Sequence, residues 1–179
     1  MIIGICGTIC SGKSTAVEYL RDQYKFKVLS TGLEVTIEAK ARDIEVNRLN
    51  LQNLGKKLEF EFPGYWPRGL MARMEDSVDY VVDILRYPHR VAIFREMENF
   101  ILLGITANTT IREQRFFLRN RIGDGDFKTA DKNDRYILQR TQECLQMSDS
   151  IFYNNGDINE LHNWLDSHNG GKNVDWSCR

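Results

Sequence analysis

Short apolar runs alternate with longer amphipathic stretches along this chain, and the alternation predicts its secondary structure. Short apolar segments predict strands at residues 1–6, 79–83, 100–106 and 150–154, and alternation of polar and apolar residues predicts another at 25–30. Stretches with helical spacing of apolar residues predict helices at residues 12–24, 33–60, 70–78, 110–120, 133–147 and 159–168. The run 100–106 is apolar almost throughout, which is typical of a strand buried on both faces.

Prolines and glycines mark loops between these elements. Pro63 and Pro67 flank a Gly-Tyr-Trp segment and predict a loop, and the Gly-Asp-Gly-Asp sequence at 123–126 predicts a polar one. Strands that alternate with helices predict an α/β protein. We expect a parallel sheet of about five strands with helices on both faces, a three-layer arrangement.

The order of the elements also predicts where a ligand would bind. In open parallel sheets, ligands lie beyond the carboxyl ends of the strands. Gly7 follows the first predicted strand, Ser30 ends the second and Asp83 ends the third, so we expect all three beside one crevice. A single domain is expected over residues 1–168, followed by a flexible tail at 169–179.

Composition narrows the classes of partner and compartment. The 179 residues include 24 Lys and Arg against 25 Asp and Glu, a net charge of -1, which argues against a nucleic-acid partner. No apolar run is long enough to cross a membrane, and the first residues lack the basic segment of a secretory signal. The four cysteines show no metal-ligand spacing. We expect a cytoplasmic protein, and the sequence leaves both a monomer and a homodimer open.

The strongest motif is the phosphate-binding pattern G-x-x-x-x-G-K-S, which stands between a predicted strand and a predicted helix. Gly7 and Gly12 allow backbone conformations in which N–H groups point at a phosphate. Lys13 can reach the outer phosphates, and the Ser14 hydroxyl can hold Mg²⁺. The alternative is a merely structural glycine-rich turn. The residues expected at the phosphates are Gly7, Thr8, Ile9, Cys10, Ser11, Gly12, Lys13, Ser14 and Thr15.

With this motif and three further segments, the chain resembles the P-loop kinases of small phosphate acceptors. These are the nucleoside monophosphate kinases, deoxynucleotide kinases and dephospho-coenzyme A kinases. Segment 83–86 stands where they carry Asp-Gly-x-Arg, and 154–157 resembles their Asn-x-Gly segment. Segment 48–55 resembles an acceptor-side Leu-Gln-x-Leu-Gly element. The resemblance implies a P-loop NTPase fold with an acceptor-side helical region at 31–78 and a small lid at 121–134.

The resemblance also implies roles for residues around the ATP phosphates. It places ATP on residues 7–15 and on Asn155 and Gly156, with Mg²⁺ held by Ser14 and Asp83. Asp83 could instead orient the acceptor, or simply cap the next helix. Catalytic roles are expected for Lys13, Asp83, Arg115 and Arg119.

Arginines before and within the predicted lid are candidates for stabilising the transferred phosphate. Arg112, Arg115 and Arg119 recur at helical spacing and share one face, and Arg121 begins the lid. The alternative is a solvated basic face, which is the interpretation for Arg112. Two lid acids, Asp131 and Asp134, are expected either to pair with arginines on closure or to be solvated.

The acceptor is expected to contact residues of the helical region and of the segment after the third strand. Arg48 and Gln52 lie one helical turn apart and could bind a phosphate and a base edge. Arg86 could anchor the acceptor phosphate or be a surface arginine. Tyr65 and Trp66 could stack on a base, although packing in the core is an equally good interpretation.

Together these features predict ATP-dependent phosphoryl transfer to a (deoxy)nucleoside monophosphate. Two departures from the kinase pattern keep alternatives open. Ile84 replaces the glycine expected after the strand acid, and the chain also resembles the kinase-like N-terminal portion of fungal deoxycytidylate deaminases while lacking the deaminase zinc signature. A catalytically silent nucleotide-binding module is therefore one alternative. A dephospho-coenzyme A, RNA or modified-nucleotide kinase is another.

Overall fold

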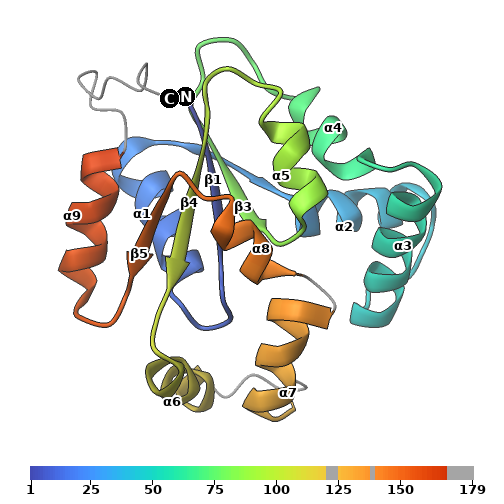
Figure 1. Cartoon of the computed structure of the whole chain (residues 1–179). Coiled ribbons are helices and arrows are strands. Elements are labelled where there is room, and N and C mark those ends of the chain that lie inside the picture. Colours follow the sequence, from blue (N-terminus) through green and yellow to red (C-terminus); the bar gives the residue numbers. More distant parts are fainter. Residues whose placement is uncertain (120–124, 138–139, 169–179) are drawn as a thin grey trace.

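A five-stranded parallel sheet forms the centre of the protein, in the order β2-β3-β1-β4-β5 (Figure 1). The computed structural model describes residues 1–119, 125–137 and 140–168. The strands are β1 (Ile2–Gly7), β2 (Lys27–Ser30), β3 (Tyr80–Leu85), β4 (Phe100–Thr106) and β5 (Ser150–Tyr153). The α/β prediction is thus confirmed, and the expected tail at 169–179 lies outside the described residues.

Helices cover both faces of the sheet. The helices are α1 (Lys13–Tyr24), α2 (Thr31–Ala41), α3 (Arg48–Glu61), α4 (Tyr65–Met71), α5 (Pro88–Phe94), α6 (Thr109–Arg119), α7 (Phe127–Lys132), α8 (Thr141–Gln146) and α9 (Ile158–His168), with a π-helix, η1 (Asn133–Ile137). Helices α1 and α9 pack on one face, and α4, α5 and α8 on the other. None of these described helices is long and apolar enough to span a bilayer.

Successive side chains of β3 point to opposite faces of the sheet and pack in the two helical layers. Val81 packs with the side chains of α1 and α9, whereas Tyr80 and Val82 pack with those of α4, α5 and α8. All three side chains are at most 2% exposed. Because both faces are buried, the central strands read as continuous apolar runs, which is why the sequence identified them.

The acceptor-side region differs from the prediction in three places. The helix predicted over 33–60 is two helices, because α2 ends at Ala41 and Asn47 caps α3 by accepting the N–H of Asn50. The loop predicted at 63–67 contains the start of α4, which follows Gly64 at φ 84°. Helix α4 ends at Met71, so most of the helix predicted over 70–78 is absent.

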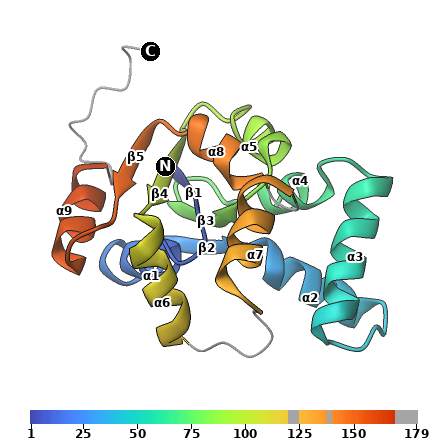
Figure 2. The same ribbon diagram turned by 60° about the horizontal axis from the view of Figure 1, so that its bottom comes forward.

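Two further differences concern short helices. Helix α5 was not predicted, although Pro88 at its first turn is a recognised start signal. The helix predicted over 133–147 is interrupted, since η1 and α8 are separate elements. Helix α7 lies in the predicted lid and is adjacent to α6 (Figure 2).

Gly7 is required where β1 turns into the following loop. Its φ is 143°, and a Cβ atom there would lie 1.9 Å from the Ile105 carbonyl oxygen of β4. We expect Gly7→Ala to lower the free energy of unfolding by at least about 2 kcal/mol, because a backbone atom cannot move aside without disturbing the sheet. Urea titration measures the effect.

Gly69→Ala is the matched control. Gly69 lies within α4, and nothing stands within 4 Å of a Cβ built there. Alanine should therefore stabilise the protein by about 0.5–1 kcal/mol through its better helix propensity. Equal effects of the two substitutions would contradict the steric argument.

Candidate functional site

A cavity of about 660 Å³ lies at the carboxyl ends of the strands. The loop between β1 and α1 forms its floor, and α3, α6, α7, η1 and the connection from β5 to α9 form its walls. Its lining residues are Ile9, Cys10, Ser11, Gly12, Lys13, Ser14, Thr15, Arg48, Gln52, Arg86, Arg115, Arg119, Ala130, Asn133, Asp134, Asn154, Gly156, Ile158 and Leu161.

The side chains that line this cavity carry a strong net positive charge. Among the described residues it contains five basic side chains, and Asp134 is its single acid. The basic residues are Lys13, Arg48, Arg86, Arg115 and Arg119. They come from elements far apart in the sequence, and a shared cavity of one sign favours anionic ligands. The whole chain is nearly neutral, so the positive charge is a property of the site.

The loop after β1 has the backbone geometry of an anion cradle. Gly12 has φ 106° and is the N-cap of α1, which has no side-chain cap, so N–H groups of the first helical turn remain available to an anion. Asn154 supports the loop from β5, because its Nδ2 donates to the Ser11 carbonyl at 2.8 Å. A Cβ atom on Gly12 would stand 2.4 Å from that nitrogen. The buried Ser11 hydroxyl has no hydrogen-bond partner among the described residues.

Lys13 is the buried cation at the centre of the site. It is 7% exposed, and its Nζ donates to the Thr8 carbonyl at 2.6 Å. Burial, with Arg86 adding to it, lowers the pKa of Lys13 to about 8, and Asp134 opposes that shift. A phosphate oxygen at this point would supply a counter-charge to the ammonium, so the site fits the phosphates of ATP.

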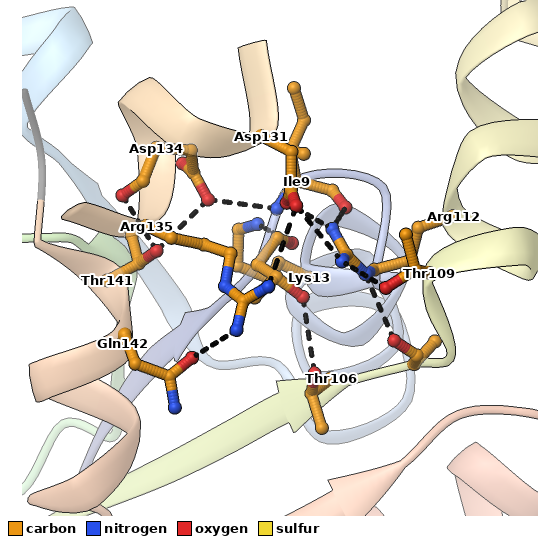
Figure 3. Close-up of polar contacts among 12 residues, drawn as sticks. Ile9, Lys13, Thr106, Thr109, Arg112, Asp131, Asp134, Arg135, Thr141 and Gln142 are labelled. Carbon is orange, nitrogen blue, oxygen red and sulfur yellow. Dashed lines mark hydrogen bonds and ion pairs between the residues drawn. The ribbon is translucent and has the colours of Figure 1, made fainter. Parts of the chain in front are cut away.

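Arg112 is buried and holds the lid against the loop (Figure 3). Its Nη1 donates to Asp131 Oδ1 of α7 at 2.5 Å and to the Ile9 carbonyl at 3.4 Å. From the other side, Asp134 Oδ2 accepts the Ile9 N–H at 2.9 Å. The interpretation of Arg112 as solvated is therefore wrong. Asp131 and Asp134 are buried as well. Asp131 accepts from the Arg112 guanidinium, and Asp134 accepts the Ile9 N–H.

Two more arginines of α6 face the cavity. Arg115 has a buried Nη1 with no hydrogen-bond partner among the described residues. The Arg119 guanidinium lies over the Phe116 ring, 5.0 Å from its centre. Arg121 and the start of the predicted lid lie outside the described residues. A buried guanidinium nitrogen without a partner is costly, so the Nη1 of Arg115 fits a ligand that brings an anion to it.

Asp83 lies beside the site without lining the cavity. It pairs with Ser30 in the register of β2 and β3, and β3 continues to Leu85, two residues beyond the predicted strand end. Burial raises the pKa of Asp83 above its ordinary value, although Arg86, Lys13 and a hydrogen bond from Ser30 oppose this. The side chain therefore lies near enough to Lys13 to interact with its charge, but it is not among the residues that line the cavity.

The predicted acceptor-side residues divide into two groups. Arg48 and Gln52 of α3 line the cavity. Trp66 does not: it is 3% exposed, it packs in a separate hydrophobic cluster, and its Nε1 donates to the Gly55 carbonyl at 3.0 Å. Tyr65 packs edge-on against Trp66 with ring centres 5.0 Å apart. Stacking of these rings on a base is thus replaced by core packing, the alternative that the sequence had left open.

The segment after β5 contributes Asn154 and Gly156 to the cavity lining. Asn155 is not a lining residue, and its Oδ1 accepts the N–H of Asn108 at 2.8 Å. Sequence reasoning missed Ala130, Asn133, Asn154, Ile158 and Leu161 as lining residues. Only Asn154 carried a signal, since it begins the Asn-x-Gly-like segment.

Comparisons with known proteins identify the fold. No protein-family model matches the sequence, and no curated protein is significantly similar to it. Solved structures do match. TT1252 from Thermus thermophilus has 19% identity and a TM-score of 0.66, with 98% of each chain covered. Shikimate kinase from Acinetobacter baumannii, in complex with shikimate, has 11% identity and a TM-score of 0.60, covering 97% of this chain and 95% of that one.

Shikimate kinase from Aquifex aeolicus is a third such structure, with 16% identity, a TM-score of 0.56, and coverage of 96% of this chain and 99% of that one. The protein therefore has the fold of the P-loop kinases. Identities this low establish the fold alone, because one fold carries many functions.

Proposed function

We propose that the protein is an ATP-dependent phosphotransferase whose acceptor is a small phosphorylated molecule, a nucleoside or deoxynucleoside monophosphate. The observation that carries this proposal is the buried Lys13 in a cavity with five basic side chains and one acid. Phosphoryl transfer needs positioning and positive charge around the transferred group, and little covalent chemistry. The cavity supplies both.

The two ends of the cavity suit the two substrates. ATP would place its phosphates on the loop that contains Lys13 and Ser14, with its base toward Ile158 and Leu161. Bound with ATP, Mg²⁺ would neutralise charge that develops on the phosphate oxygens. The described residues form no cluster of three or more His, Cys, Asp or Glu that could hold a metal alone. The ion would therefore arrive with the nucleotide, with the Ser14 hydroxyl as its direct protein partner and with Asp83, which does not line the cavity, acting on it through water.

The acceptor would occupy the side formed by α3 and the end of β3. Arg48 and Arg86 supply two positive charges there, and the Gln52 amide lies on the same helix face as Arg48. Two arginines suit a dianionic phosphate, which they can bind through paired hydrogen bonds. An amide can read the edge of a base.

One observation favours a second candidate, a nucleotide-binding module without transfer activity. Ile84 stands in β3, directly before the cavity-lining segment, where similar kinases have glycine. Such a module would bind nucleotide and produce no ADP. A dephospho-coenzyme A kinase or a kinase of an RNA or modified nucleotide would use the same site with a different acceptor.

The deciding experiment measures ADP release with Mg²⁺-ATP. The acceptors are nucleoside monophosphates, deoxynucleoside monophosphates, dephospho-coenzyme A and an RNA oligonucleotide. Acceptor-dependent turnover with one monophosphate class supports the proposal, and Arg48→Ala should then raise the KM for the acceptor more than that for ATP. Nucleotide binding without turnover for any acceptor supports the silent module.

Nucleotide affinity should fall as pH rises above about 8, the pKa of Lys13. The neutral amine cannot pair with a phosphate, and a bound phosphate favours the ammonium, so each binding event takes up a proton above this pH. The dissociation constant should rise by nearly tenfold per pH unit between about 8 and 10. Calorimetry in buffers of different ionisation enthalpy measures both quantities. A flat profile to pH 10 would contradict the assignment.

A further inference from the structure

Thr8, Ile9, Cys10 and Ser11 form a tight turn in the loop between β1 and α1. The Ser11 N–H donates to the Thr8 carbonyl at 3.2 Å and closes this turn. Cys10, its third residue, has a φ of 59°, whereas Ile9, its second, lies outside the positive-φ region. This combination is typical of a type II turn, which normally carries glycine at the third position. A side chain there is disfavoured by about tenfold, so the turn needs a contact from elsewhere in the protein to hold it in this form.

The alternative form of the turn differs in one peptide. Rotation of the central Ile9–Cys10 peptide would give a type I turn, whose third residue has a φ of about −90° and accepts cysteine readily. In a trans peptide the carbonyl and the N–H point in opposite directions, and the described residues contain no cis peptide bond. The rotation would therefore exchange the directions of the Ile9 carbonyl and the Cys10 N–H.

Arg112 of α6 contacts the carbonyl of this central peptide. Its Nη1 donates to the Ile9 carbonyl at 3.4 Å. This distance is long for a hydrogen bond, but the donor carries a charge and its side chain is only 2% exposed, so water does not compete for it. The guanidinium is fixed by other contacts, since Nε donates to the Ala107 carbonyl at 3.0 Å and the two Nη atoms donate to Asp131 at 2.5 and 3.3 Å (Figure 3). It cannot follow the carbonyl if the peptide rotates.

The preceding peptide of the turn is held by other groups. The Ile9 N–H donates to Asp134 Oδ2 at 2.9 Å, and the Thr8 carbonyl accepts from Lys13 Nζ at 2.6 Å. The Thr8–Ile9 peptide is thus fixed at both of its polar atoms. Arg112 acts on the next peptide, the one whose direction separates the two forms of the turn.

We propose that Arg112 is a positioning residue for phosphate binding, because it holds the Ile9 carbonyl and so keeps the turn in its type II form. This inference rests on the proposed function of the site. Ile9 and Cys10 line the cavity, whereas Arg112 does not. A carbonyl turned toward Arg112 directs the Cys10 N–H to the opposite side, where it can donate to a phosphate oxygen of ATP. The rotated peptide would instead present a carbonyl oxygen, which repels a phosphate.

The test measures the dissociation constant of Mg²⁺-ATP for wild type, Arg112→Lys, Cys10→Gly and the double variant. Lysine keeps a positive charge for Asp131 but lacks the fork that reaches Asp131 and the Ile9 carbonyl together. The preference of cysteine for the type I form is then unopposed, so the dissociation constant of Arg112→Lys should rise by about tenfold. Glycine removes that preference. In the double variant most of the affinity lost in Arg112→Lys should therefore return.

Arg135→Lys is the matched control. Arg135 also contacts Asp131, at 3.7 Å, and its guanidinium donates to Gln142 at 3.2 Å (Figure 3). Its replacement should leave the affinity for Mg²⁺-ATP as in wild type. If Arg112 merely joined α6 to α7, Arg112→Lys would lower thermal stability and affinity together, and Cys10→Gly would restore neither. An unchanged affinity in Arg112→Lys, a loss that Cys10→Gly does not restore, or an equal loss in Arg135→Lys overturns the inference.

A second pair of variants decides the question if Arg112→Lys does not fold. Arg112→Met combined with Asp131→Leu replaces the buried ion pair by apolar side chains and leaves no unpaired charge. It also removes the donor to the Ile9 carbonyl, so Cys10→Gly should again restore affinity. Absence of that rescue overturns the inference.

Failure of the proposed function gives a different result. A wild-type protein that does not bind Mg²⁺-ATP refutes the phosphate site itself. Binding by wild type, together with an Arg112→Lys variant that binds equally well or is not rescued by Cys10→Gly, refutes the positioning role alone.

Discussion

Lys13→Ala should abolish acceptor-dependent ADP release, with a loss of about 10³-fold or more in kcat/KM. Positive charge aimed at the transferred group is the main catalytic contribution in phosphoryl transfer, and losing a single donor of this kind costs about 10²–10³-fold in other enzymes. Lys13 combines that position with burial, so water cannot replace its charge. Steady-state ADP release with the best acceptor measures the effect.

The same substitution should not lower stability. Burial holds the pKa of Lys13 at about 8, well below its ordinary value, so the protonated side chain opposes folding at neutral pH. The free energy of unfolding of Lys13→Ala in urea should therefore be at least that of wild type. Lys25→Ala, which removes an exposed lysine just after α1, is the control for activity and should retain it. Loss of activity through unfolding of Lys13→Ala would contradict this explanation.

Asp131→Ala should be the most destabilising single substitution of the lid, by about 3–5 kcal/mol. Asp131 is the carboxylate partner of Arg112, whose side chain is only 2% exposed. Removing the acid leaves a buried guanidinium without a counter-charge, and the interior cannot solvate it. The two side chains also join α6 to α7, so packing between these helices would loosen. Chemical unfolding followed by far-UV circular dichroism measures the loss.

An exposed ion pair provides the comparison. Arg21 and Asp22 are bonded at 2.7 Å on the surface of α1, where both side chains are more than half exposed. Asp22→Ala should leave the urea midpoint unchanged, because water replaces the lost contact. Similar losses for Asp22→Ala and Asp131→Ala would show that burial of the Arg112 pair has no energetic consequence.

The sheet could be predicted from the sequence because its strands are buried on both faces and carry a strong local signal. The helical elements were harder. The break between α2 and α3 depends on the Asn47 cap, and the turn into α4 depends on Gly64 at φ 84°, both short-range features inside otherwise helical sequence. The interruption of the helix at η1 has no local signal; there Asp134 accepts the N–H of Ile9, a contact between residues 125 positions apart in the sequence.

The residues of the site likewise divide into those that a local sequence signal identifies and those that depend on distant contacts. The phosphate loop was recognisable because its geometry depends on glycines at fixed spacing. Arg112 was misjudged because its partners, Asp131 and the Ile9 carbonyl, are 19 and 103 residues away in the sequence. The sequence left Trp66 open between stacking on a base and core packing, and the structure places it in a small core with side chains of α2 and α3. Long-range pairing decides such cases, and a single sequence does not reveal it.

The place of β1 in the sheet has a consequence for synthesis on the ribosome. It is the first strand to be made, yet it lies in the middle, hydrogen-bonded to β3 on one side and β4 on the other. Its partners begin only at Tyr80 and Phe100. At about 5–20 residues per second, the nascent chain carries an unpaired apolar strand for several seconds. The loop that β1 leads into can therefore adopt its final position only after residues 100–106 have been translated, and until then the apolar side chains of β1 are exposed to aggregation.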